Sequence, residues 1–157
     1  MDEGTTAALG RWTMKGPMDD GRPYARTMDE TTLTNKIRSV RDLAVYRTAF
    51  DSAMQIFEIS KTFPKGEMYS LTDQIRRSSR SVCSNLAEAW RKRKYKAVFI
   101  NKLTDAGQEC AETQTWLEFA LRCNYINKET FLKLDDCYEH IFAMMNVMEK
   151  KVDTFCK

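Results

Sequence analysis

The chain has 157 residues with a formal net charge of +3; 43% of them are apolar and 30% are charged. This length suits one domain, and six Gly and three Pro are few enough to favour helices over strands. No stretch approaches the roughly 20 apolar residues that span a bilayer, and no basic start followed by an apolar core suggests secretion.

The five cysteines make an odd count without a C-x-x-C pair: Cys83, Cys110, Cys123, Cys137 and Cys156. This set argues against a disulfide framework and against a structural zinc site. Each cysteine lies in a helical pattern, where Cys behaves as a small buried apolar residue. We therefore expect a reduced, cytoplasmic protein that does not associate with membranes.

Residues 1–36 differ from the rest of the chain. They hold four of the six Gly, two of the three Pro and seven Thr, without a sustained apolar period. Terminal segments without an apolar pattern rarely pack on a domain. We predict a flexible N-terminal tail over residues 1–36 and one folded domain over residues 37–157.

Two helices are predicted next, each opening with a capping-box pattern, Ser39-x-x-Asp42 and Ser70-x-x-Asp73. Phe63-Pro64 ends the first helix. Its apolar stripe is Leu43, Tyr46, Phe50, Ala53 and Phe57, and the stripe of the second helix is Leu71, Ile75, Ser78, Val82, Leu86 and Ala89.

The second predicted helix is unusually rich in small residues: Ser78, Ser79, Ser81, Cys83, Ser84, Ala87 and Ala89. Serine has middling helix propensity, so these residues lower the intrinsic stability of the helix. They also allow a neighbouring backbone to approach closely. We expect this face to make a contact beyond one bundle.

A third helix is predicted from Lys96 to Arg122 and a fourth after the N-cap residue Asn127. The third carries the stripe Phe99, Leu103, Ala106, Cys110, Thr113, Leu117 and Ala120, and the fourth carries Phe131, Leu134, Tyr138, Ile141, Met145, Met148, Val152 and Phe155. Four long amphipathic helices with short connections and no strand pattern predict an all-α, antiparallel up-down four-helix bundle.

One segment, residues 73–96, concentrates the positive charge. It holds eight basic and two acidic residues, a net charge of +6, so the rest of the chain sums to −3. A local positive field of this kind points to a polyanionic partner, most commonly nucleic acid. The candidate nucleic-acid-binding residues are Arg76, Arg77, Arg80, Trp90, Arg91, Lys92, Arg93, Lys94, Tyr95 and Lys96.

Each part of this basic segment has two interpretations. The run from Trp90 to Lys96 either contacts phosphates, with Trp90 or Tyr95 stacking on a base, or is a solvated loop whose charge favours the C-terminal end of a helix. The three arginines of residues 76–80 either contact phosphate or pair with Glu residues of a neighbouring helix or subunit, since the guanidinium fork accepts both.

Catalytic and metal-binding patterns are absent from the sequence. A di-iron bundle requires two Glu-x-x-His motifs, whereas this chain has one histidine, His140, with Cys137 three residues before it. No Gly-rich phosphate loop, nucleophile elbow or catalytic triad candidate occurs. We predict a protein that is not an enzyme and that uses no cofactor or metal.

The sequence resembles a bacterial family first noticed as products of reading frames inside intervening sequences of large-subunit ribosomal RNA genes. The resemblance covers about residues 40–155 and rests on Asp42-Leu43-x-Val45-Tyr46, Phe63-Pro64-Lys65, Tyr69-x-Leu71-Thr72-x-Gln74-Ile75-Arg76-Arg77 and Ser84-Asn85-Leu86-Ala87-Glu88. Three positions depart from the family pattern: Cys83 replaces a usual proline, Ala89 a common glycine, and Arg80 a usually apolar residue.

This resemblance implies a four-helix bundle that assembles as a ring-shaped homopentamer. A related branch contains accessory proteins of diversity-generating retroelements, basic pentamers that partner a reverse transcriptase and nucleic acid. The function of the intervening-sequence branch itself is unassigned.

Together these observations favour a non-enzymatic, homo-oligomeric helical-bundle adaptor that binds RNA or DNA through its basic segment. The alternative is a structural protein-interaction scaffold, in which the arginines form intersubunit ion pairs with Glu109, Glu112 or Glu118.

Overall fold

The computed structural model describes residues 37–156 of the chain, so the tail predicted over residues 1–36 lies outside the described residues. Four long helices, α1 (Ala44–Ser60), α2 (Asp73–Lys92), α3 (Lys96–Arg122) and α4 (Lys128–Lys150), dominate this part. Shorter helical elements complete it: η1 (Val40–Asp42), η2 (Lys65–Glu67), η3 (Met68–Thr72) and α5 (Val152–Phe155). The described residues contain no strand.

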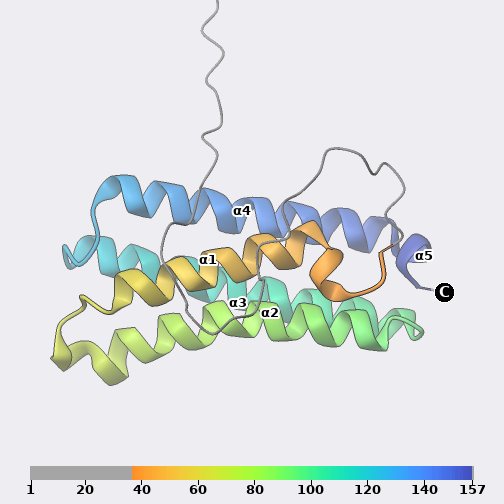
Figure 1. The fold of residues 1–157 in the computed structure, drawn as a ribbon, viewed down its shortest axis with the longest axis horizontal. Helices are drawn as coiled ribbons and strands as arrows, with labels where there is room; N and C mark the ends of the chain where they lie inside the picture. The colour runs from red at the N-terminus through yellow and green to blue at the C-terminus, as the bar shows by residue number, and fades with distance from the viewer. Residues whose placement is uncertain (1–36, 157) are drawn as a thin grey trace, which may run out of the picture. The chain divides into compact units, whose positions relative to one another are not determined.

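The four long helices form an antiparallel bundle in which each helix packs against its neighbours in sequence and α4 closes against α1 (Figure 1). The pair α2 and α3 has the most extensive contact. Large side chains from all four helices fill the centre, among them Ile56, Ile75, Phe99, Leu117 and Tyr138. The predicted all-α up-down bundle is confirmed, and none of the helices in residues 37–156 is long and apolar enough to cross a membrane.

Only part of the apolar stripe predicted for the first helix is buried, namely Leu43 and Ala53. Val45, Ala49 and Ile56 are buried, whereas Phe50 is 40% exposed. Tyr46 and Phe57 are half-buried at the edge of the helix. The prediction was wrong for Tyr46, Phe50 and Phe57, because apolar residues occupy most of the circumference of α1 and spacing alone does not select the side that packs on the core.

The predicted capping box at Ser39 forms, but it caps the short turn η1 rather than α1. Asp42 Oδ2 accepts from the backbone N–H groups of Arg38 (2.9 Å) and Ser39 (2.8 Å). These two hydrogen bonds lower the pKa of Asp42. Leu43 is then extended, and α1 begins at the next residue.

The second predicted capping box, Ser70-x-x-Asp73, does not form. The chain passes through the π-helical segment η3 into α2 without a side-chain cap. The Ser70 hydroxyl instead donates to the carboxylate of Glu67, which also accepts from the Tyr125 hydroxyl at 3.1 Å. Beyond this entry, the predicted stripe of α2 is confirmed, since all six of its residues are buried.

Helices α3 and α4 match their predicted positions. The bounds of α3 are the predicted ones, and the Asn127 side chain caps α4 by accepting from the Thr130 N–H at 2.8 Å. The predicted fourth helix is interrupted after Lys150, so the last two residues of its apolar stripe, Val152 and Phe155, lie in the short helix α5. Phe155 of α5 nevertheless stacks on Phe99, with ring centroids 6.1 Å apart.

The small residues of α2 are used mainly within one subunit, which corrects the expectation that they form an external contact face. Ser78, Ser79, Cys83 and Ala89 are all buried inside the described bundle. The Ser78 hydroxyl is hydrogen bonded to Thr113 Oγ1 of α3 at 2.9 Å. Small side chains therefore bring α2 close to α3, and only Ser81, Ser84 and Ala87 of the set retain exposed surface.

All five cysteines are free, as predicted. Only Cys83 and Cys110 are buried, however, and Cys123 is exposed at the end of α3. Burial raises the pKa of Cys83 to about 11 and that of Cys110 to about 12. These two thiols therefore remain protonated at neutral pH and lack the reactivity of a thiolate.

Candidate nucleic-acid interface

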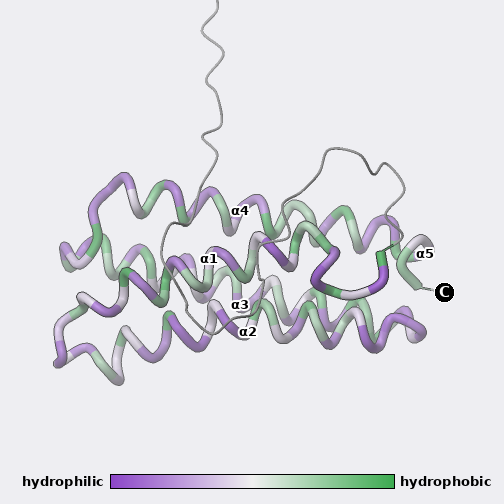
Figure 2. Tube along the Cα trace, in the orientation of Figure 1, coloured by the Kyte–Doolittle hydropathy of each residue, from purple (hydrophilic) through white to green (hydrophobic). Residues whose placement is uncertain are grey.

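The basic segment runs along α2 and through its connection to α3. Figure 2 shows this connection in the colours of hydrophilic residues. Because an α-helix rises about 1.5 Å per residue, Arg76 and Arg91 of α2 lie about 22 Å apart along its axis. The candidate cations thus form two groups, one in the first turns of α2 and one around its C-terminal end.

Arg77 is paired within its own chain. Its Nη2 donates to Glu112 Oε1 of α3 at 2.9 Å and to Gln74 Oε1 at 3.1 Å. The same Glu112 oxygen accepts from the indole N–H of Trp116 at 3.2 Å. The structure therefore favours the ion-pair interpretation for Arg77, with a carboxylate of a neighbouring helix.

Arg76 and Arg80 have different surroundings. Arg76 Nε donates to Ser60 Oγ of α1 at 2.7 Å. The guanidinium carbons of Arg76 and Arg80 lie 5.1 and 5.7 Å from the ring centroid of Phe57. Within residues 37–156 neither arginine forms an ion pair, so both keep N–H groups for an anionic partner.

Trp90 and Arg93 are structural residues at the end of α2. Trp90 is only 8% exposed, and the guanidinium carbon of Arg93 lies 4.0 Å from its ring centroid. Arg93 Nη1 also donates to the Trp90 carbonyl at 2.6 Å. The predicted stacking of Trp90 on a base is therefore wrong, because the core and Arg93 cover the indole.

Two lysines of the segment are paired with acids. Lys92 lies 3.5 Å from Glu88 one turn earlier, and Lys96 forms an ion pair with Asp153 of α5. The hydrogen bond to Asp153 raises the pKa of Lys96. These contacts reduce the charge that either lysine can offer to a phosphate.

Arg91 and Lys94 remain without an ion pair among the described residues, and both are exposed. Lys94 Nζ lies 4.8 Å from the ring centroid of Tyr95, which is 56% exposed. Tyr95 is therefore the accessible aromatic residue of the connection. The cations of the predicted site without an ion pair among residues 37–156 are thus Arg76 and Arg80 at one end of α2 and Arg91, Arg93 and Lys94 at the other, where Arg93 is half-buried on Trp90 and the other two are exposed.

Two residues outside the predicted set shape this distribution. Lys102 of α3 lies 3.2 Å from Glu88 and 3.1 Å from Asp105, and its hydrogen bond lowers the pKa of Glu88. Phe57 of α1 supports the two arginines described above. The contact of Lys102 with Asp105 is a local i,i+3 pair, whereas its contact with Glu88 and the contacts of Phe57 with the arginines join different helices, for which the local sequence gives no signal.

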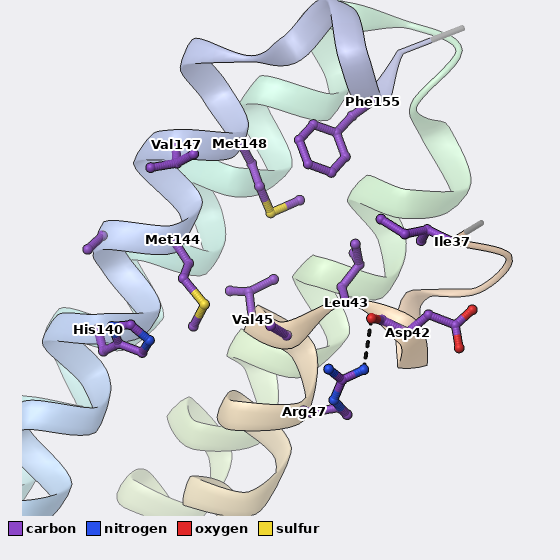
Figure 3. A pocket seen from close by; sticks show the side chains of 12 residues that line it. Ile37, Asp42, Leu43, Val45, Arg47, His140, Met144, Val147, Met148 and Phe155 are labelled. Carbon is purple, nitrogen blue, oxygen red and sulfur yellow. Dashed lines mark hydrogen bonds between the residues drawn. The ribbon is translucent and has the colours of Figure 1, made fainter. Parts of the chain in front are cut away.

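A separate groove of about 540 Å³ lies between the start of α1 and the end of α4. Figure 3 shows Met144 and Met148 facing Leu43 and Val45 across it. Its lining is largely apolar, and Arg47 at its edge donates to the backbone carbonyl of Asp42 at 2.8 Å. Arg47 is the one lysine or arginine among the described residues that line it and Asp42 lies beside it, so the groove lacks the cluster of cations expected of a nucleic-acid site.

The family of this chain follows from comparison with known sequences. A family model described as 23S rRNA-intervening sequence protein matches residues 41–147. The chain belongs to this family. The family resemblance predicted from the sequence motifs is therefore confirmed.

A solved structure agrees with this family assignment. It is a protein of unknown function from the S23 ribosomal protein family of Bacteroides thetaiotaomicron VPI-5482, 29% identical to this chain with a TM-score of 0.63. The match covers 68% of this chain and 99% of that one. No match was found among curated proteins.

Proposed function

We propose that this 23S rRNA-intervening sequence protein is a homo-oligomeric, non-enzymatic adaptor that binds RNA or DNA through the unpaired cations of its basic segment. One observation carries the proposal. Arg76, Arg80, Arg91 and Lys94 have no carboxylate partner within residues 37–156, although the chain outside the basic segment is net negative.

The non-enzymatic part of the proposal rests on the poverty of candidate reactive groups. Within the described residues no three His, Cys, Asp or Glu side chains are grouped so as to hold a metal ion. The two buried thiols have raised pKa values, and His140 is the single histidine of the chain. Few side chains are left for general acid–base or nucleophilic chemistry.

Oligomerisation would strengthen binding through a small patch. A few cations per subunit bind nucleic acid weakly, but a ring of subunits multiplies their effect through avidity. Large apolar side chains on α3 and α4 keep exposed surface that subunit contacts would cover, among them Phe119 at 55% and Leu132 at 53%. We propose a pentamer, and light scattering should give a mass near five times the 18.3 kDa of the monomer.

A second candidate function is a protein-interaction scaffold. It is favoured by the ion pair between Arg77 and Glu112, since it shows that an arginine of this stretch does take a carboxylate. In that case Arg76 and Arg80 would pair with acids of a neighbouring subunit, such as the exposed Glu118, which lies 4.0 Å from Arg122 within its own chain. Glu109 suits this role less well, because one of its carboxylate oxygens is buried without a partner among the described residues.

Salt-dependent binding separates the two functions. We expect labelled single-stranded RNA or DNA to bind the parent protein, with an affinity that falls as salt rises. The double variant Arg91→Gln/Lys94→Gln should reduce the slope of log affinity against log salt by about 1.4, since each phosphate contact contributes about 0.7. The matched control Arg122→Gln/Lys128→Gln removes two exposed cations from the α3–α4 connection and should leave the slope unchanged.

Fluorescence anisotropy at several salt concentrations measures the affinity and its dependence on salt. A variant that no longer assembles but still binds nucleic acid as the parent does would contradict a contribution of avidity to binding. Equal binding by the parent and by both double variants at every salt concentration would contradict the adaptor and favour the scaffold.

A further inference from the structure

One side of α2 carries cations at its ends and small residues between them. At about 100° per residue, Arg76, Arg80, Ser84, Ala87 and Arg91 fall within an arc of about 80°. Ser84 is exposed and Ala87 is half-buried. This row therefore runs for about 22 Å with charge at both ends and little side-chain bulk in the middle.

A row of aromatic residues runs along α1 in the same way. Tyr46, Phe50 and Phe57 fall within an arc of about 40° on this helix. The rings of Tyr46 and Phe50 are stacked, with centroids 6.1 Å apart and planes inclined by 28°. Phe50 presents 40% of its surface to solvent, which is unusual for a phenylalanine beside a well-packed core.

The two rows flank the same boundary between α1 and α2, which lie side by side in Figure 1. Arg76 is hydrogen bonded to Ser60, so the antiparallel register places Phe50 level with Leu86 and Tyr46 level with Trp90. Phe50 thus lies beside the small middle of the α2 row, between its charged ends. We call these eight residues the α1–α2 seam: Tyr46, Phe50, Phe57, Arg76, Arg80, Ser84, Ala87 and Arg91.

None of the eight seam residues is acidic, but Asp73 falls within the same arc of α2, three residues before Arg76, and other acids occur close to the seam in sequence. Asp51 lies next to Phe50 but about 100° further round α1; burial raises its pKa, Arg47 opposes its charge, and that charge also acts on the Cys83 thiol of α2. Glu88 lies next to Ala87 but reaches Lys102 on α3. The charge offered along the seam is therefore positive, and it complements an anionic chain.

We propose that the α1–α2 seam is the path of a single strand of nucleic acid, with phosphates on Arg80 and Arg91 and a base stacked on Phe50. This inference rests on the proposed function and specifies the form of its ligand. A positive track with aromatic side chains along it is the usual arrangement for single strands. A duplex keeps its bases stacked on one another, so it offers no base face to Phe50.

Single substitutions test this path. The probe is a fluorescein-labelled dT20 or U20 oligonucleotide, bound to the full chain and followed by anisotropy. Phe50→Leu retains an apolar side chain but removes the ring, and we expect roughly a 5- to 150-fold weaker Kd, the range for loss of one base–aromatic stack. Arg80→Gln should lower the salt slope by about 0.7.

Two controls accompany these variants. Arg122→Gln removes one exposed cation at the end of α3, outside the seam, and should bind as the parent does. A 20-base-pair duplex should bind the parent more weakly than dT20 and should be insensitive to Phe50→Leu. Thermal melting of each variant verifies that it is folded.

The outcomes separate the path from the proposed function. If Arg91→Gln/Lys94→Gln weakens binding while Phe50→Leu and Arg80→Gln bind as the parent, the path is wrong and the proposed function stands. If the parent binds neither oligonucleotide, both are wrong. If an acidic protein, and not nucleic acid, shields the seam residues from chemical modification, the scaffold function replaces both the path and the adaptor function.

Ultraviolet crosslinking locates the strand directly. Irradiation of the complex with U20, followed by mass spectrometry, should attach uridine to the peptide that contains Tyr46 and Phe50. Attachment only to the peptide that contains Tyr95 would place the strand on the α2–α3 connection instead, and would overturn the seam as its path.

Discussion

The two flanks of α2 satisfy their polar side chains in opposite ways. On the flank that faces α3, four polar groups meet a partner on that helix: Arg77 meets Glu112, Ser78 meets Thr113, and Asn85 and Glu88 meet Lys102. On the flank that faces α1, Arg76 and Arg80 lie against the ring of Phe57 without a carboxylate among the described residues.

This difference indicates which basic residues serve folding and which remain for a ligand. A guanidinium paired with a carboxylate has its charge opposed, whereas one held on an aromatic face keeps its N–H edge and its charge available. The local sequence Arg76-Arg77 places neighbouring residues in these two states. Charge density along a sequence therefore overestimates the charge that a folded surface offers.

The largest expected effect comes from the core that both flanks share. Ile75→Ala should lower the free energy of unfolding by about 2–5 kcal/mol, because Ile75 is fully buried and its loss leaves a cavity. Urea denaturation measures the change. The exposed control Gln108→Ala should cost less than about 0.5 kcal/mol, and an equally small change for Ile75→Ala would place that residue outside the core.

A smaller effect is expected on the flank that faces α3. Thr113→Val keeps the shape of the side chain but removes the buried hydrogen bonds to Ser78 and to the Glu109 carbonyl. We expect a loss of about 1–3 kcal/mol, since Ser78 loses a partner in a buried place. Thr104→Val, which removes an exposed hydroxyl from the same helix, should change stability by less than about 0.5 kcal/mol in the same denaturation assay.

A double-mutant cycle compares the two flanks directly. Arg77→Gln and Glu112→Gln should couple by about 0.2–1 kcal/mol, the range for a partly exposed ion pair. Arg80→Gln and Glu112→Gln should show no coupling within error. Coupling of Arg80 equal to that of Arg77 would mean that both arginines share the acid, and would remove the distinction between the flanks.

The smallest effect is a dependence on pH. Lys102 lowers the pKa of Glu88 below its usual value of 4.5, so the ionised carboxylate stabilises the folded chain above that pH. The stabilisation should be lost as the pH falls below about 4.5 and through the lowered pKa of the folded state. Thermal melting of Glu88→Gln against the parent should converge at low pH; a constant difference from neutral to acid pH would contradict this linkage.

Most of the fold could be predicted from local patterns. The bounds of α3, the buried stripes of α2 and α4 and the N-cap at Asn127 were all predicted, because apolar spacing and capping chemistry act over a few residues. The stripe of α1 could not be predicted in this way. Val45, Tyr46, Ala49 and Phe50 alone spread apolar surface over an arc of about 140°, so only packing against α2 and α4 selects the buried side.

The features of the candidate site divide in the same way, into those set by the sequence and those set by the tertiary structure. The sequence by itself determined that positive charge concentrates in residues 73–96 and that the chain forms a four-helix bundle, since composition and period are properties of the chain. Only the tertiary structure decided that Arg77 is paired, that Trp90 is buried and that Arg80 stays free. The physical reason is that a side chain's charge and exposure depend on residues of other helices, and Glu112 and Phe57 lie far from the basic segment in sequence.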